Sequence, residues 1–320
     1  MSYYSDKIKF LNDIFGSVTL KNSNEIIINS KKYEIIDDVI ILNNYQKEID
    51  LKKKEVINSF SNEWNEFNDL HSNHTKEFND YFDIIDISIL KDKVFADFGC
   101  GIGRWTKILN NYVETKCNIL IDYSDSIFQA RNNLKNLTNS IFIKADIDKI
   151  KLKSDIFDFF ICLGVLHHIP LGIKSSIRNI ANSSNEGICY LYYDFENRGY
   201  IFKTIFKIAN LLRSFLCNIK NKHLRKYINF LLVIFLYCPF IYLSKIAKFI
   251  GLNYTRIPLS YYINSDFNRL FQDSYDRFFT NIEHRFSKPK IEEYFKEFFD
   301  EIVFSNNEPY WHFVVKKHKN

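Results

Sequence analysis

Short runs of apolar residues, each ending in polar or glycine-rich segments, organise the middle of this chain. Val94 to Phe98 is apolar apart from Asp97, as expected of a parallel strand that is buried on both faces. From Trp105 onward the apolar residues take helical spacing. Between the two patterns, glycines occupy alternate positions: Gly99, Gly101 and Gly103. The pattern predicts a strand, a glycine-rich turn and a helix in direct succession.

Further apolar segments follow at regular intervals. The second, third and fourth predicted strands are 118–122, 141–146 and the first part of 157–170. A helix over 175–181 and a fifth strand over 187–194 come next, and the terminal segments 302–304 and 311–315 are also apolar. Strands that alternate with helical patterns indicate an α/β fold with a largely parallel sheet.

The glycine-rich turn indicates a ligand site. Glycines let a ligand approach the backbone more closely than any Cβ would allow, and the positive end of the next helix faces the turn. A dinucleotide site would need Gly-x-Gly-x-x-Gly, but Arg104 stands where its third glycine would fall. Asp122 lies about 20 residues downstream, where a carboxylate can hold a ribose hydroxyl pair. The pattern therefore fits a nucleoside ligand without a pyrophosphate.

In this order the four strand motifs, over roughly residues 92 to 195, resemble class I S-adenosylmethionine-dependent methyltransferases. The similarity is greatest to the methyltransferase type 11 group, which includes enzymes of ubiquinone and menaquinone biosynthesis. It implies a Rossmann-like, seven-stranded sheet flanked by helices and closed by an antiparallel terminal hairpin. It also implies S-adenosyl-L-methionine as the cofactor. No metal site is expected, because the six cysteines include no Cys-x-x-Cys pair. The alternative is that these are strand-end acids and turn glycines of another α/β fold.

The resemblance also implies roles for individual residues. Asp97 and the glycine turn would line the methionine half of the cofactor, Asp122 would hold the ribose, and Asp146 with Ile147 would flank the adenine. Asp158 corresponds to an acid that is usually structural. The expected cofactor-binding residues are Asp97, Gly99, Cys100, Gly101, Gly103, Asp122, Tyr123, Asp146, Ile147 and Leu163.

Methyl transfer from a sulfonium is an in-line displacement, so the protein must chiefly align the acceptor and exclude water. A hydroxyl or activated carbon acceptor also needs a base with a pKa near the working pH. His167 and His168 follow the fourth strand, where the acceptor should lie, and are the candidate catalytic bases, with a packing role as the alternative. The candidate substrate-binding residues are Tyr193, Asp276, His284 and Arg285.

The amino-terminal residues 1–48 form a predicted small β unit with strands at 17–20, 25–28, 32–36 and 39–42. The unit resembles the second half of a zinc-ribbon domain whose first metal-binding cysteines would fall near Asn12 and Phe15. Because neither is cysteine, we expect a metal-free remnant with a structural or partner-docking role. Residues 49–198 would hold a helical segment around Trp64 and Phe67, either a lid or core packing, followed by the cofactor domain.

The modest net charge of +5 conceals an asymmetry. Residues 201–260 contain ten Lys and Arg and no Asp or Glu, so the other 260 residues carry a net charge of −5. Within this block, 201–219 is predicted to be a basic amphipathic helix, and 220–226 a basic connector. Residues 230–243 are apolar throughout, but fourteen residues are too few to span a bilayer, which needs about 20. Pro239 is also expected to interrupt the run.

The insertion, residues 199–262, has three open interpretations. It is a substrate cap, an anchor that lies in the headgroup region of an anionic membrane, or an RNA-binding surface. Peripheral membrane contact would run through residues 201–248. The last segment, 263–320, would supply a helix and the antiparallel hairpin that complete the sheet.

The sequence therefore predicts a methyltransferase that acts on oxygen or carbon of a small-molecule or lipid-linked acceptor, in cell-surface saccharide, quinone or secondary-metabolite biosynthesis. The alternatives are an RNA methyltransferase and a non-catalytic binding module. Nucleic acid is not expected as a partner, because the fourth strand is followed by His-His-Ile-Pro and not by an Asn-Pro-Pro-Tyr type of motif. Six cysteines without a Cys-x-x-Cys pair, and a polar first decapeptide, favour a cytoplasmic protein, peripheral on the inner face of the membrane if anchored.

Overall fold

The structure of the protein is a computed structural model that describes residues 2–42, 73–169, 173–280 and 284–318. The predicted segment around Trp64 and Phe67 lies outside these residues. The chain forms two compact units, which are described separately. The larger unit contains residues 1–194 and 284–320, and the smaller unit contains residues 195–283, within which the predicted insertion falls.

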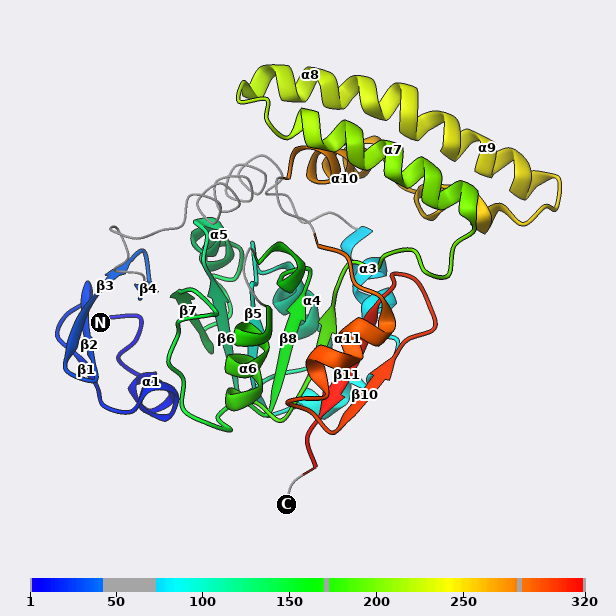
Figure 1. The fold of residues 1–320 in the computed structure, drawn as a ribbon. Coiled ribbons are helices and arrows are strands. Elements are labelled where there is room, and N and C mark those ends of the chain that lie inside the picture. Colours follow the sequence, from blue (N-terminus) through cyan, green and yellow to red (C-terminus); the bar gives the residue numbers. More distant parts are fainter. Residues whose placement is uncertain (1, 43–72, 170–172, 281–283, 319–320) are drawn as a thin grey trace. The chain divides into compact units, whose positions relative to one another are not determined.

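The larger unit is built on one twisted sheet (Figure 1). Five parallel strands form its middle and an antiparallel pair closes one side, in the order β7-β6-β5-β8-β9-β11-β10. This confirms the predicted methyltransferase-like α/β sheet and its terminal hairpin. The strands are β5 (Val94–Phe98), β6 (Cys117–Asp122), β7 (Ser140–Lys144), β8 (Phe159–Leu163), β9 (Glu186–Tyr190), β10 (Glu301–Phe304) and β11 (His312–Lys316).

The sheet has eleven strands among the described residues, so the predicted count of seven was too low. The four additional strands are those predicted in the amino-terminal unit, and they form an antiparallel meander. Its last strand pairs in parallel with β7, because the edge of β7 offers backbone groups that would otherwise lack strand partners. The strands are β1 (Val18–Leu20), β2 (Glu25–Ile28), β3 (Lys31–Ile36) and β4 (Val39–Ile41).

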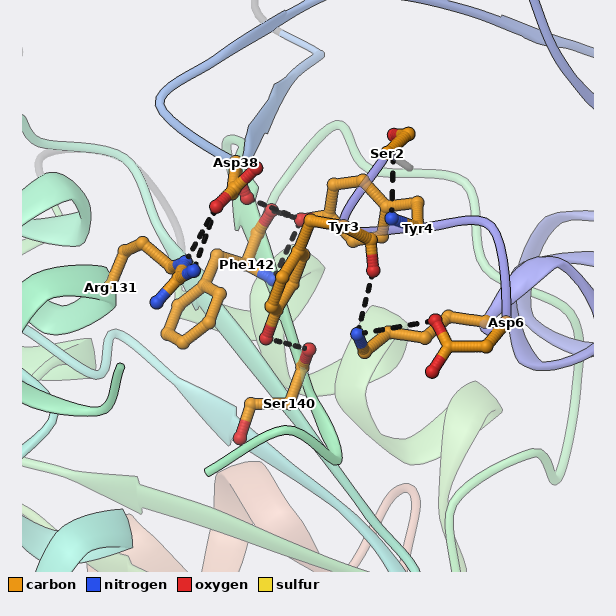
Figure 2. Close-up of polar contacts among 9 residues, drawn as sticks. Ser2, Tyr3, Tyr4, Asp6, Asp38, Arg131, Ser140 and Phe142 are labelled. Carbon is orange, nitrogen blue, oxygen red and sulfur yellow. Dashed lines mark hydrogen bonds and ion pairs between the residues drawn. The ribbon is translucent and has the colours of Figure 1, made fainter. Parts of the chain in front are cut away.

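Two tyrosines attach the start of the chain to the seam between β4 and β7 (Figure 2). Tyr4 is fully buried, and its hydroxyl lies 2.6 Å from the Asp38 carbonyl oxygen and 3.2 Å from that of Phe142. Tyr3 donates to a backbone carbonyl of β7, and Arg131 forms an ion pair of 2.7 Å with the Asp38 carboxylate. These contacts join the turn before β4 to both β7 and the helix that follows β6. The amino-terminal unit is therefore part of the main sheet structure.

Helices cover both faces of the sheet. In β5, Ala96 and Phe98 pack with residues of α6 and α11, whereas Phe95 points the other way and packs with residues of α3 and α4. The segment around Asn12 and Phe15 is helical, which the sequence pattern did not predict. The helices are α1 (Ile8–Phe15), α3 (Asn73–Tyr81), α4 (Arg104–Tyr112), α5 (Ser126–Asn133), α6 (Ile173–Ser183) and α11 (Lys288–Phe295), with short 3-10 turns η1 (Ile87–Leu90) and η2 (Leu166–His168).

The smaller unit is helical around its own apolar core. The predicted amphipathic helix of 201–219 is confirmed as α7, and α10 packs against both α7 and α8. The buried core residues are Val233, Tyr237, Ile241, Leu270, Phe278 and Phe279. The elements are α7 (Tyr200–Leu216), α8 (Lys222–Leu232), a π-helical segment η3 (Val233–Tyr237), α9 (Cys238–Phe249), the 3-10 turns η4 (Tyr254–Arg256) and η5 (Ser260–Tyr262), and α10 (Phe267–Phe279).

Two predictions about this unit were wrong. Most of the expected connector is helical, because the Asn221 side chain accepts a hydrogen bond from the Leu224 N–H at 3.1 Å and starts α8 there. Pro239 does not interrupt the helix, which runs for 28 residues from Lys222 to Phe249. The wider π turn of η3 accommodates the missing N–H and the ring of the proline.

By length and composition, this helix of the described residues could cross a bilayer, with a mean hydropathy of 2.0 over its most apolar window. A single helix of this kind is weak evidence for a membrane span.

Candidate functional site

The predicted glycine turn lies between β5 and α4. Gly99, Gly101 and Gly103 have φ angles of +73°, +54° and +75°, a region that other residues rarely adopt. A Cβ on Gly99 would overlap the side chain of Val165, and one on Gly103 would lie 2.7 Å from a methyl carbon of Leu134. Glycine is therefore required here by backbone conformation and by packing.

Asp122, at the end of β6, braces this turn. Its Oδ2 accepts the Gly101 N–H at 2.8 Å, and its Oδ1 accepts both the N–H and the hydroxyl of Ser124, at 2.8 and 2.7 Å. Because each carboxylate oxygen has two lone pairs, Oδ2 can accept one further donor. Burial raises the pKa of Asp122, and the hydrogen bonds from Ser124 and Gly101 oppose that shift. Sequence reasoning missed Ser124, although Asp-x-Ser is a common turn pattern.

Asp97, at the end of β5, is buried beside the turn. The Thr106 hydroxyl, on the first turns of α4, donates to its Oδ2 at 2.7 Å. Burial raises the pKa of Asp97 to about 7, although the Thr106 hydrogen bond and the charge of Arg104 act in the opposite direction. A buried carboxyl of this kind gains most from a cationic ligand, which would favour its charged form. Thr106 was also missed by sequence reasoning.

The remaining predicted cofactor residues lie on the same edge of the sheet. Because the strands are parallel, the residues that follow β5, β6, β7 and β8 meet at their carboxyl ends. Cys100, Ile147 and Leu163 are buried there, and Tyr123 is half-buried. Asp146 is buried too, and its Oδ1 accepts the Asp148 N–H at 3.1 Å.

Asp158 has a structural role, as the resemblance implied. It lies at the opposite end of the sheet, where its Oδ2 accepts the N–H of Val94 at 2.9 Å. This hydrogen bond joins the segment before β8 to the first residue of β5.

The two predicted histidines follow β8 in the turn η2. His167 is fully buried and stacks on Tyr192, with ring centroids 3.8 Å apart and an angle of 21° between the rings. The ring of His168 lies 4.2 Å from that of His167. Burial lowers the pKa of His167 well below its usual range, with further lowering from the charges of His168 and Arg285. His167 is therefore neutral at neutral pH.

A backbone hydrogen bond decides how the His167 ring can act. Its Nδ1 accepts the Tyr192 N–H at 3.4 Å, so the ring proton is on Nε2. This Nε2 is buried and has no hydrogen-bond partner among the described residues. In this tautomer the imidazole can donate a hydrogen bond to a ligand oxygen. A role for either histidine as the base stays a prediction.

The larger unit brings three further predicted residues to the histidines. The His284 N–H donates to the His167 carbonyl oxygen at 2.9 Å. Arg285 Nη1 donates to the Tyr193 carbonyl oxygen at 3.0 Å, and its guanidinium lies 5.1 Å from the ring centre of Tyr192. We call this group the histidine–tyrosine cluster: His167, His168, Tyr192, Tyr193, His284 and Arg285.

Two residues remain: Asp276, which was predicted to bind substrate, and Tyr192, which was not predicted. Asp276 belongs to the smaller unit, where it lies on α10 and accepts the Thr280 hydroxyl at 2.9 Å. Tyr192, which fixes the His167 ring, was not predicted. The strand alternation of 187–194 gave no sign that this ring would stack on a histidine of another segment.

Comparisons with known proteins agree with this geometry. Residues 95–187 match the family described as "Methyltransferase domain". None of the curated proteins matches the sequence. The matched stretch contains the glycine turn and the three strand-end acids Asp97, Asp122 and Asp146.

Several solved structures show a distant similarity to this chain. Human N-acetylserotonin methyltransferase in complex with S-adenosylmethionine has 11% identity, over 84% of this chain and 57% of that chain, with a TM-score of 0.46. Magnesium protoporphyrin IX methyltransferase from Synechocystis PCC 6803 with bound S-adenosylhomocysteine has 11% identity, over 85% and 90%, with a TM-score of 0.40. The pyocyanin biosynthetic protein PhzM has 12% identity and a TM-score of 0.41, and the aligned part of this chain (75%) spans only 54% of it.

The likeness to the quinone-biosynthesis group and to a zinc ribbon stays a prediction. The family match and the observed sheet order support a coarser conclusion: residues 95–187 resemble a methyltransferase domain, and S-adenosyl-L-methionine is the cofactor that fits such a domain.

Proposed function

We propose that this chain is an enzyme that transfers a methyl group from S-adenosylmethionine to oxygen or carbon of a small-molecule or lipid-linked acceptor. One observation carries the proposal. The residues suited to the cofactor and the histidine–tyrosine cluster follow neighbouring parallel strands, at the same edge of the sheet. The cofactor and an acceptor would therefore meet there.

The residues present fit the cofactor. Gly99 and Gly101 of the turn are half-buried, and Asp122 Oδ2 has capacity for a ribose hydroxyl. Asp97 is a buried carboxyl that a cationic methionine group would stabilise in its charged form. The bound cofactor supplies an electrophilic methyl group on a sulfonium.

The histidine–tyrosine cluster fits an oxygen-containing acceptor. His167 presents a buried Nε2–H, which can donate to an acceptor oxygen and orient it. The guanidinium of Arg285 is held between the Tyr193 carbonyl and the Tyr192 ring, and it can bind an anionic or polar part of the same molecule. His168 lies beside His167 and is the proposed base for an acceptor that must lose a proton.

The acceptor class follows from these groups. Few charges line the cluster, and aromatic rings dominate it, which suits a molecule with an apolar or planar body and one polar group. Intermediates of cell-surface saccharide, quinone or secondary-metabolite biosynthesis have this chemistry, and we propose that the acceptor is one of them.

The test uses purified chain, methyl-labelled S-adenosylmethionine and host extract, followed by separation into lipid, small-molecule, saccharide, protein and RNA fractions. The Asp122→Ala variant should lose cofactor affinity and transfer. The Asp155→Asn variant is the matched control, because Asp155 is an exposed acid at the opposite end of the sheet. A thermal melt of each variant shows that it is folded.

Three results are informative. Label in the lipid or small-molecule fraction, lost in Asp122→Ala only, supports the proposal and identifies the acceptor. Label in RNA contradicts it in favour of an RNA methyltransferase. Cofactor binding without transfer to any fraction contradicts it in favour of a non-catalytic binding module.

A further inference from the structure

The long helix of the smaller unit, Lys222–Phe249, is apolar on two sides. Its inner side packs in the core of the unit through residues such as Val233, Tyr237 and Ile241. Its other side exposes large apolar side chains at helical spacing, and Tyr242 and Phe249 are 66% and 91% exposed. We call this side the outer apolar surface: Tyr227, Phe230, Ile234, Tyr242, Ile246 and Phe249.

Positive charge borders the outer apolar surface at both ends. The 18 residues 227–244 contain no charged side chain, whereas Lys222 and Lys226 precede them and Lys245 and Lys248 follow. Lysines at both ends of an apolar helix side can place their ammonium groups among lipid headgroups, both in a helix that lies in the interface and in one that crosses the bilayer. Anionic lipids attract basic residues at this depth.

Three acidic side chains at the start of α10 and along it have partners within that helix. Asp266 caps α10, Asp273 forms an ion pair of 3.0 Å with Arg269, and Asp276 accepts a hydrogen bond from Thr280. In the part of the chain that the structure describes, neither Lys245 nor Lys248 forms an ion pair. At the carboxyl end of the outer apolar surface, the positive charge of Lys245 and Lys248 is therefore not compensated by an ion pair.

A hollow at the carboxyl end of the helix is lined by both lysines and apolar side chains. It has a volume of about 440 Å³, is open to solvent and is lined by Lys245, Lys248, Phe249, Ile263 and Asn264. Two ammonium groups beside a phenyl ring suit a phosphate whose attached chains are apolar. A phospholipid has this combination in one molecule.

We propose that the outer apolar surface binds the surface of an anionic phospholipid bilayer, with the helix Lys222–Phe249 lying in the plane of the headgroup region. The apolar side chains would enter the boundary with the acyl chains, and the lysines at both ends would contact phosphates. This proposal goes beyond methyl transfer and does not depend on it.

The inner side of the helix argues for lying on the bilayer and against crossing it. Asn229 is fully buried, and its side-chain amide donates to the Phe271 carbonyl of α10 at 2.7 Å. α10 also carries Arg269 and Asp273. A crossing helix would have to break its contacts with α10 or take these charges into the hydrocarbon region, and both are costly. Binding through one side retains every contact of the unit.

The test is co-sedimentation of the full chain with vesicles of phosphatidylglycerol and phosphatidylcholine, compared with vesicles of phosphatidylcholine alone. We expect binding to the anionic vesicles only, weaker at high salt. The double variants Tyr242→Ser with Phe249→Ser, and Lys245→Glu with Lys248→Glu, should each bind at least about tenfold more weakly.

Matched controls come from the larger unit. Tyr112 is 54% exposed, so Tyr112→Ser removes an exposed aromatic ring elsewhere, and Lys91→Glu with Lys151→Glu reverses two exposed charges. Both controls should bind vesicles as the unchanged chain does. The readout needs no cofactor or acceptor, so its result is independent of the proposed enzyme activity.

Several outcomes would overturn the proposal. They are no sedimentation with anionic vesicles, undiminished binding of the Tyr242→Ser, Phe249→Ser variant, or bound protein that resists alkaline extraction as a spanning helix does. A dimer in sedimentation equilibrium that this variant converts to monomer would instead assign the surface to a second copy. Salt-sensitive RNA binding without vesicle binding would assign it to nucleic acid.

Discussion

Gly99 meets two separate constraints, a left-handed backbone and contact with Val165. We predict that Gly99→Ala destabilises the protein by about 2 to 4 kcal/mol, which combines left-handed strain with overpacking. It should also weaken S-adenosylmethionine binding more than about tenfold, because the turn proposed to hold the cofactor must shift. Urea unfolding and calorimetric titration measure the two effects.

The control for this substitution is Gly251→Ala. Gly251 has nearly the same φ, +76°, but a Cβ there would have nothing within 4 Å. Gly251→Ala should lower the free energy of unfolding only by the backbone strain, about 1 to 2 kcal/mol, and should leave cofactor affinity unchanged. If both substitutions lower the free energy of unfolding equally, the contact with Val165 does not contribute to the effect of Gly99→Ala.

The raised pKa of Asp97 predicts pH-dependent cofactor binding. With a pKa of about 7 in the free protein, Asp97 is mostly neutral at pH 6 and mostly charged at pH 8. A cationic ligand prefers the carboxylate, so affinity should rise over this range and level off above it. In Asp97→Asn the affinity should be lower and should not rise with pH. Titration calorimetry at several pH values measures both, and an unchanged pH profile in the variant would contradict the assignment.

The same group should lower stability as the pH rises. The pKa of Asp97 in the folded protein lies above its unfolded value of 3.8. The contribution of the protonated carboxyl to the free energy of unfolding is therefore fully present below pH 4 and is lost as the pH rises through 7. The difference amounts to about 4 kcal/mol, since each pKa unit corresponds to about 1.4 kcal/mol. Asp97→Asn should therefore gain stability relative to the unchanged chain at pH 8 and not at pH 4. Thermal melts at the two pH values test this.

At the scale of elements, the seam between β4 and β7 depends on Tyr4. Its hydroxyl lies within hydrogen-bond distance of the Asp38 carbonyl and of the Phe142 backbone. Tyr4→Phe should reduce the free energy of unfolding by about 1 to 3 kcal/mol, because buried backbone groups lose a partner. Chemical denaturation measures this. Tyr112→Phe, at an exposed tyrosine, is the control and should have no effect.

Element boundaries were predictable where the pattern is local. The predicted second strand, 118–122, differs from β6 by one residue, and the terminal hairpin differs by a similar amount. The helix around Pro239 was not predictable in the same way. A proline normally ends a helix, and only the π turn before it and the packing of that turn in the core keep the helix continuous.

At the scale of the molecule, the smaller unit is an insertion whose ends are held together in the larger unit. The Asp194 N–H donates to the Phe286 carbonyl at 3.2 Å, and Tyr193 forms a β bridge with Phe286. We predict that a short glycine–serine linker can replace residues 195–283 with cofactor affinity unchanged and vesicle binding lost. Calorimetry and co-sedimentation measure these two properties. A variant that no longer folds or binds cofactor would show that the larger unit depends on the insertion.

The sequence by itself determined the features that a few neighbouring residues encode. Strand periodicity, the glycine turn and the acids at strand ends were enough to predict the α/β sheet and a nucleoside ligand. The resemblance of these motifs to class I methyltransferases then implied the cofactor. These features depend on local backbone preference and on the side-chain chemistry of single segments.

Only the tertiary structure decided features that join distant segments. The pairing of β4 with β7, the burial and tautomer of His167 set by Tyr192, and the exposure of one side of Lys222–Phe249 are of this kind. Each depends on which surfaces meet after folding. An apolar residue has the same pattern in sequence whether its partner is the core of its own chain or lies outside it, and only the folded arrangement distinguishes the two.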